Sequence, residues 1–156
     1  MSGEQGNASL VAVLVLPLLV LVLGVVLDLG MLRQSAARVR AAADLATLVA
    51  VNDQDEAALA ERGELHLAAD AESVAREYLL RNLTPVGASL GATAHDIAAA
   101  AEVAVFPEGG VDQRAGRTYD RPTVRLFVEV PLRTGLLRAV LGPTVVIRAL
   151  SAAAAR

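Results

Sequence analysis

Residues Asn7–Leu27 read NASLVAVLVLPLLVLVLGVVL, and the nature of this segment governs the interpretation of the whole chain. From Ala8 to Leu27, 20 consecutive residues carry no charged side chain. A helix rises about 1.5 Å per residue, so these residues would span about 30 Å, the thickness of the hydrocarbon core of a bilayer. We therefore predict a membrane-spanning helix over residues 7–27. Pro17 removes one hydrogen bond and is expected to bend this helix, which membrane helices tolerate.

Two other interpretations of this segment fit less well. The apolar core of a secretion signal is about 7–15 residues long, follows a basic region and precedes a small-residue cleavage site. Here the run is longer, residues 1–6 (MSGEQG) contain no Lys or Arg, and the Ala-rich stretch Arg40–Ala46 lies well beyond the run. A buried helix of a soluble core is rarely apolar all round for this length. The membrane span remains the best interpretation.

The helix is predicted to continue past the membrane over residues 28–51. Apolar residues recur there at spacings of 3 and 4, the repeat of a packing helix. We call these residues the apolar seam: Leu29, Leu32, Ala36, Val39, Ala43, Ala46 and Ala50. Its small side chains would let a partner helix approach closely, or the seam could lie on the chain's own domain, and the sequence leaves both alternatives open. One helix from about Asn7 to Val51 would be roughly 65 Å long, and the polar turn formers of Val51–Glu56 end it.

Composition limits what the remaining chain can be. The 156 residues suffice for one modest domain beside the span. The net charge of −3 and the lack of a basic stripe interleaved with aromatic residues argue against nucleic-acid binding. The sequence contains no cysteine, which excludes disulfides and thiolate metal sites.

Residues 52–156 are predicted to form a small α+β head with a second helix and a short antiparallel sheet. A helix is expected within Ala57–Leu83, with Asp70 as a candidate N-cap and Thr84-Pro85 at its end. The alternation of Val124, Leu126, Val128 and Val130 predicts a half-buried strand. The full set of further expected elements is strands at 102–106, 123–130 and 144–155, a turn-rich loop at 107–122, and a short helix at 131–142 that begins near Pro131.

Nothing in the sequence indicates catalysis, a cofactor, a metal or a small-molecule substrate. His66 and His95 each have a neighbouring carboxylate, but nothing brings them together, and surface histidines explain both. Gly109-Gly110 does not belong to a phosphate-binding loop. Five arginines are interleaved with acidic residues, which predicts a solvated mixed surface: Arg114, Arg117, Arg121, Arg125 and Arg133.

The segment Gly6–Ala50 resembles the TadE/TadG-like pseudopilins of tight-adherence (Flp-type, type IV-like) pilus machines. The matching stretches are QGNASLVAVLVLPLLVLVLGVVLDLG and RQSAARVRAAADLATLVA. The shared pattern is a Gly before small residues, a Pro-containing apolar span that closes in Asp-x-Gly, and an Arg-bearing helix that ends in AAADLATLVA.

The resemblance implies a function, a location and partners. A prepilin peptidase would cut after Gly6 and leave Asn7 as the new N-terminus, so that residues 1–6 are a leader peptide. The chain would be a minor pilin or pseudopilin, a non-enzymatic structural component of a pilus or secretion filament. It would act by helix packing and head docking with other pilins. Its place would be the bacterial cell membrane, as a single-pass protein with an extracytoplasmic head, or an extracellular filament.

Two features depart from the family pattern. Family members usually carry Glu at the fifth mature position, which is Val11 here. The leader also lacks the usual basic residues, so by the positive-inside rule Arg33, Arg38 and Arg40 after the span favour a cytoplasmic head, against the placement that the resemblance implies. The alternative is an unprocessed single-pass membrane protein with a small extracytoplasmic binding domain that does not enter a pilus.

Overall fold

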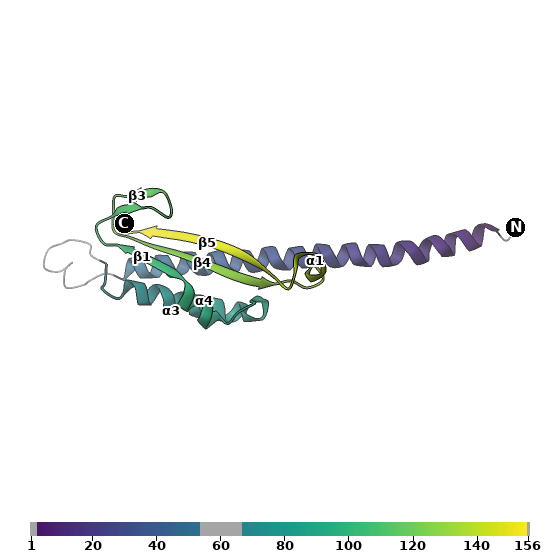
Figure 1. The fold of residues 1–156 in the computed structure, drawn as a ribbon, viewed down its shortest axis with the longest axis horizontal. Helices are drawn as coiled ribbons and strands as arrows, with labels where there is room; N and C mark the ends of the chain where they lie inside the picture. Colours follow the sequence, from purple (N-terminus) through teal and green to yellow (C-terminus); the bar gives the residue numbers. More distant parts are fainter. Residues whose placement is uncertain (1–2, 54–66, 156) are drawn as a thin grey trace.

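The computed structural model describes residues 3–53 and 67–155, and its dominant element is one long helix (Figure 1). Helix α1 runs from Gly3 to Asn52 over 50 residues and passes through Pro17 without a break. The predicted continuation of the helix past Asp28 is therefore confirmed. The helix ends at Asn52, within the predicted polar stretch, whose residues 54–56 lie outside the described part.

The remaining elements form a small head along the C-terminal half of α1, which confirms the α+β class. They are α3 (Ala71–Leu83), the 3-10 helix η1 (Thr84–Ser89), α4 (Ala94–Ala100), β1 (Glu102–Phe106), β2 (Gly110–Asp112), β3 (Arg117–Tyr119), β4 (Thr123–Arg133), α5 (Arg138–Leu141) and β5 (Thr144–Ala154). Of the helix predicted within 57–83, residues 57–66 lie outside the described part. Asp70 occupies the N-cap position of α3, but its side chain makes no capping hydrogen bond.

The main sheet is antiparallel in the order β1-β4-β5, so β4 is its central strand. The predicted alternation in β4 is confirmed, because Val124, Leu126, Val128 and Val130 are at most 2% exposed. These side chains face α1 and α3, which pack together and cover one face of the sheet. The C-terminal half of α1 is thus part of the core of the head, and the N-terminal half projects alone (Figure 1).

The prediction of a helix at 131–142 was wrong for the first half of this range. β4 continues through Pro131 to Arg133, and only Arg138–Leu141 is helical. The strand tolerates Pro131 because of the side that its nitrogen faces. The carbonyl of Pro131 accepts a 2.7 Å hydrogen bond from the N–H of Gly91. In an antiparallel strand the nitrogen and carbonyl of one residue face the same side. The missing N–H of Pro131 therefore faces the side where β1, which ends its pairing at Phe127, does not reach.

The loop predicted at 107–122 contains a small hairpin of β2 and β3. The Asp112 carboxylate accepts hydrogen bonds from the backbone N–H groups of Arg114 and Ala115 and so shapes its turn. The prediction of a solvated surface was wrong for Arg125, which is only 4% exposed. The hairpin supplies the buried Asp112 as its partner, at 3.0 Å from the guanidinium. Local sequence could not show this pairing, because it depends on how the hairpin folds onto β4.

Candidate functional site

The largest exposed apolar surface of the described chain is on the N-terminal half of α1. Between Val13 and Leu23 every large hydrophobic side chain is 43–72% exposed. The most apolar part of the described helix has a mean hydropathy of 2.8, and only 6% of it is buried within the chain. A helix that is apolar all round and contacts nothing of its own chain needs an apolar environment. We call Val13–Leu23 the bare segment.

The head meets α1 at an acidic residue at the end of the predicted span. Asp28 is only 5% exposed, although it follows a long apolar run. Its Oδ2 atom accepts a 2.8 Å hydrogen bond from the backbone N–H of Leu137. A Cβ atom on Gly135 would overlap the Asp28 carboxylate, so glycine allows this close approach. The carboxylate is thereby covered by the head.

Leu137 and Gly135 belong to the connection between β4 and β5, residues Thr134–Pro143, which we call the tip loop. Leu136 of this loop lies against Gly24, one turn further toward the N-terminus than Asp28. The head therefore reaches along α1 as far as the last turn of the predicted span. The sequence indicated neither this contact nor the role of Asp28. The only signal was the apolar composition of the loop, which we assigned to a helix.

The apolar seam lies mostly inside the head. Val39, Ala43, Ala46 and Ala50 are fully buried, and Leu32 and Ala36 are partly buried against the same core. Leu29 is 42% exposed. Of the two packings that the sequence left open, the structure has the seam on the chain's own domain. A partner helix would therefore have to contact another part of α1.

A short series of polar contacts, which we call the polar chain, fixes the position of α1 in this packing. The Ser151 hydroxyl donates to the Asp44 carboxylate at 2.7 Å and lies 3.0 Å from the Thr47 hydroxyl, which also donates to the Ala43 carbonyl. Because Ser151 lies on β5, these bonds fix the register of α1 against the sheet. The head is thus attached to α1 by small-residue packing, by this polar chain and by the Asp28 contact.

The predicted processing junction, Gly6 and Asn7, lies within α1, whose described backbone begins at Gly3. It stays a prediction.

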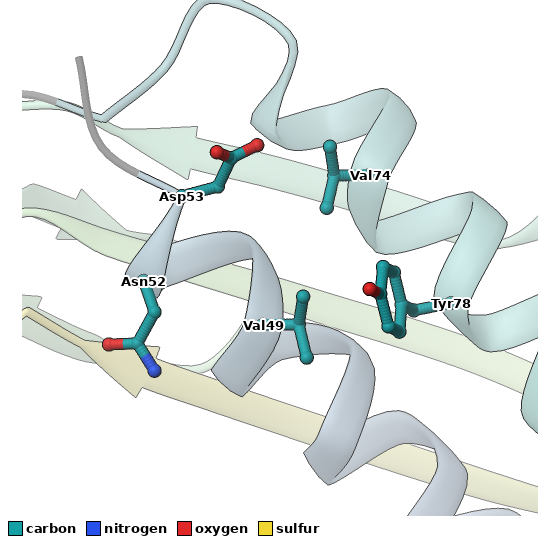
Figure 2. Close-up of a pocket in the computed structure, with 5 residues that line it drawn as sticks. All are labelled: Val49, Asn52, Asp53, Val74 and Tyr78. Atoms are coloured by element: carbon teal, nitrogen blue, oxygen red, sulfur yellow. The ribbon is translucent and has the colours of Figure 1, made fainter. Parts of the chain in front are cut away.

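The head has a shallow pocket beside the C-terminal end of α1. Its lining residues are Val49, Asn52 and Asp53 at the C-terminal end of α1, and Val74 and Tyr78 of α3 (Figure 2). Within residues 3–53 and 67–155 no three His, Cys, Asp or Glu side chains are grouped to hold a metal ion. His95 lies exposed on α4, and His66 lies outside the described residues.

Arg125 is at the centre of a cluster of ion pairs in the described part of the head. Arg125 binds Asp112 at 3.0 Å and Glu102 at 2.7 Å, and Arg114 binds Glu102 at 2.6 Å. The hydrogen bond and charge of Arg125 lower the pKa of the Glu102 carboxyl. Burial, followed by the charge and hydrogen bond of Asp112, raises the pKa of the Tyr119 hydroxyl. The cluster joins the β2–β3 hairpin to β1 and β4.

Comparison with known proteins shows a similarity for the N-terminal segment. Residues 6–53 match the model of the Tad family, described as putative Flp pilus-assembly TadE/G-like. The match covers the stretches on which the resemblance was based, and it confirms that resemblance for this part of the chain. This segment is thus similar to the corresponding part of pilus-assembly-related proteins, and it contains a helix long and apolar enough to cross a membrane. Comparisons with curated proteins and with solved structures gave no match.

Proposed function

We propose that this chain is a minor pilin or pseudopilin of a Tad-like pilus or secretion filament, and that it acts by assembly rather than catalysis. The observation that carries the proposal is the bare segment, which continues without a break into a helix fixed in the head. A chain that needs only an anchor could end its helix at the membrane. Here the same helix would span the membrane with its N-terminal half and pack in the core of the head with its C-terminal half.

In the proposed assembly the bare segment has two successive environments. Before assembly its exposed side chains face lipid, and in the filament they face the corresponding helices of neighbouring pilins. Because the apolar seam is occupied by the chain's own head, the partner contacts fall on the bare segment and on the outward side of α1, where Leu45 and Leu48 are 47% and 50% exposed. The heads then dock around this helical core, outside the cytoplasm.

The first test is the N-terminus of the protein extracted from membranes, determined by intact mass and N-terminal sequencing with and without the cognate prepilin peptidase. A chain that begins at Asn7 only when the peptidase is present supports the proposal. Co-purification with sheared pili would place the processed chain in the filament. An intact Met1 under both conditions, or a new N-terminus near Ala43 from signal-peptide cleavage, contradicts it.

Matched variants sharpen this test. Gly6→Val should block processing, whereas Gly6→Ala keeps a small residue before the cut and should retain it. Val11→Glu restores the carboxylate of the family pattern at the fifth mature position and should increase incorporation into pili. Val13→Glu places the same charge two residues further on and serves as the position control.

Val11 favours a second candidate function, a single-pass membrane protein that is not processed. A Val at this position cannot provide the carboxylate that the family uses opposite a neighbour's N-terminal amine. In this case the head would bind its partner as a monomer at the membrane. Full-length chain that stays in the membrane fraction when pili are sheared off would support this second function.

A further inference from the structure

The tip loop carries an apolar surface that the proposed function does not use. Leu136, Val140 and Leu141 are 64%, 83% and 50% exposed, although they belong to the head and not to the span. They lie within six consecutive residues. Three large exposed hydrophobic side chains so close together mark a contact with something apolar.

The position of the loop indicates what that contact is. Leu136 lies against Gly24, and Leu137 is bonded to Asp28. Gly24 precedes Asp28 by four residues, or about 6 Å along the helix axis, on the apolar side. If the span ends near Leu27, the loop lies at the depth where hydrocarbon gives way to headgroups. The exposed side chains of the loop thus continue the lipid-facing surface of the bare segment.

We propose that the tip loop inserts into the interfacial region of the bilayer as a second membrane contact of the head. Leu136, Val140 and Leu141 would enter the apolar edge of the leaflet, and the occupant of this surface is lipid. The inference requires only that α1 spans a membrane. It therefore stands or fails independently of processing and of pilus assembly.

The backbone of the tip loop suits this environment, where unpaired polar groups are costly. The N–H groups from Leu137 to Gly142 all have acceptors: Asp28 for Leu137, and carbonyls of the loop itself for the other residues. The Thr134 N–H donates to the Pro143 carbonyl and its hydroxyl donates to the Gly142 carbonyl, which closes the base of the loop. Gly142 has a φ of 82°, a conformation that glycine adopts readily.

The charges around the loop match a headgroup layer. The loop itself contains one charged residue, the exposed Arg138, and no acid. Arg133 at the end of β4 and Arg33 on α1 are also exposed. Long arginine side chains can extend from an apolar site to phosphate groups, and basic residues near the surface attract anionic lipid. The nearest acid, Asp28, is turned into the loop.

The test uses the full chain in vesicles of equal parts phosphatidylcholine and phosphatidylglycerol, at about one chain per vesicle so that copies do not meet. Because the chain contains no cysteine, Val140→Cys provides a single site for an environment-sensitive fluorophore. Val111→Cys is the matched control, since Val111 is 69% exposed on the β2–β3 hairpin at the opposite end of the head (Figure 1).

The Val140 label should show a blue-shifted emission, quenching by phospholipids with a nitroxide on the acyl chain, and protection from aqueous iodide. The Val111 label should show the reverse. Equal iodide quenching of both labels would overturn the proposal. Protection of the Val140 label only at many chains per vesicle would also overturn it, because a second copy and not lipid would then cover the loop.

A second variant separates apolar insertion from mere proximity to the membrane. With the label on Leu141→Cys, the added substitution Val140→Asp should abolish quenching by the lipid-borne nitroxide. Val140 is 83% exposed, so this change leaves the core intact. Unchanged lipid quenching in the doubly substituted chain would show that the loop is not held by its apolar side chains and would contradict the proposal.

Discussion

The carboxylate of Asp28 accepts a 2.8 Å hydrogen bond from the backbone N–H of Leu137, although 109 positions separate the two residues. This bond joins the end of the predicted span to the tip loop, the part of the head that reaches farthest along α1. It satisfies a backbone donor of the tip loop and covers a charge that would otherwise face the membrane edge. The contact therefore has consequences for both stability and placement.

Asp28→Ala should loosen the tip loop. The substitution leaves the partly buried Leu137 N–H without its acceptor, which costs less than the about 1–3 kcal/mol of a fully buried unsatisfied donor. Hydrogen–deuterium exchange of the chain in detergent should show faster exchange at residues 135–142, with little change in β1. Asp28→Asn keeps an acceptor oxygen and should show a smaller effect. Unchanged exchange in Asp28→Ala would mean that the bond does not hold the loop.

Ala46→Leu should destabilise the head, because Ala46 is fully buried where α1 packs on the sheet. Added methylene groups in a filled core cost about 1–3 kcal/mol. Urea unfolding of the full chain in detergent, followed by circular dichroism, should show a lower midpoint. Ala37→Leu is the control, since Ala37 is exposed on the same helix. Equal midpoints for the two variants would indicate that the seam is not tightly packed.

Acid should destabilise the head through Glu102. Its folded-state pKa lies below the usual value of 4.5, because Arg125 donates a hydrogen bond to the carboxylate. A depressed pKa contributes stability above the unfolded-state pKa, and this contribution is lost as pH falls through the folded-state value. The urea midpoint of the native chain should therefore fall more steeply below pH 4.5 than that of Glu102→Gln. Glu108→Gln, at an exposed position, should keep the native pH profile.

Leu19→Lys should weaken membrane insertion of the bare segment, where Leu19 is 59% exposed. A Lys near the centre of a membrane helix costs about 2.5–3.5 kcal/mol on insertion scales. Alkaline extraction of membranes should release more of this variant than of the native chain. Leu45→Lys is the matched control, because Leu45 is 47% exposed on α1 beyond the span. Equal release of the two variants would contradict a span centred on the bare segment.

Elements whose identity depends on local pattern could be predicted from the sequence. The uninterrupted apolar run and the following repeat predicted α1, and strict alternation predicted the buried face of β4. β1 and β5 were also predicted nearly to the residue.

The features that could not be predicted depend on contacts between distant segments. Pro131 favours a helix start in local terms, but it pairs with β5, and its nitrogen faces the edge of β4 beyond the end of β1, so it lies in a strand. Arg125 has the pattern of a surface residue until the β2–β3 hairpin brings Asp112 over it. The junction of Asp28 with the tip loop likewise exists only once β4 and β5 lie along α1.

The unbroken course of α1 has a mechanical consequence. With no hinge between the span and the head, any tilt of the span in the bilayer becomes the same tilt of the head. From Leu27 to Asn52 the helix extends roughly 38 Å. A tilt of about 20°, typical for a membrane helix, would displace the C-terminal end of α1 sideways by roughly 13 Å. The orientation of the anchor therefore sets where the outer end of the head can meet its neighbours.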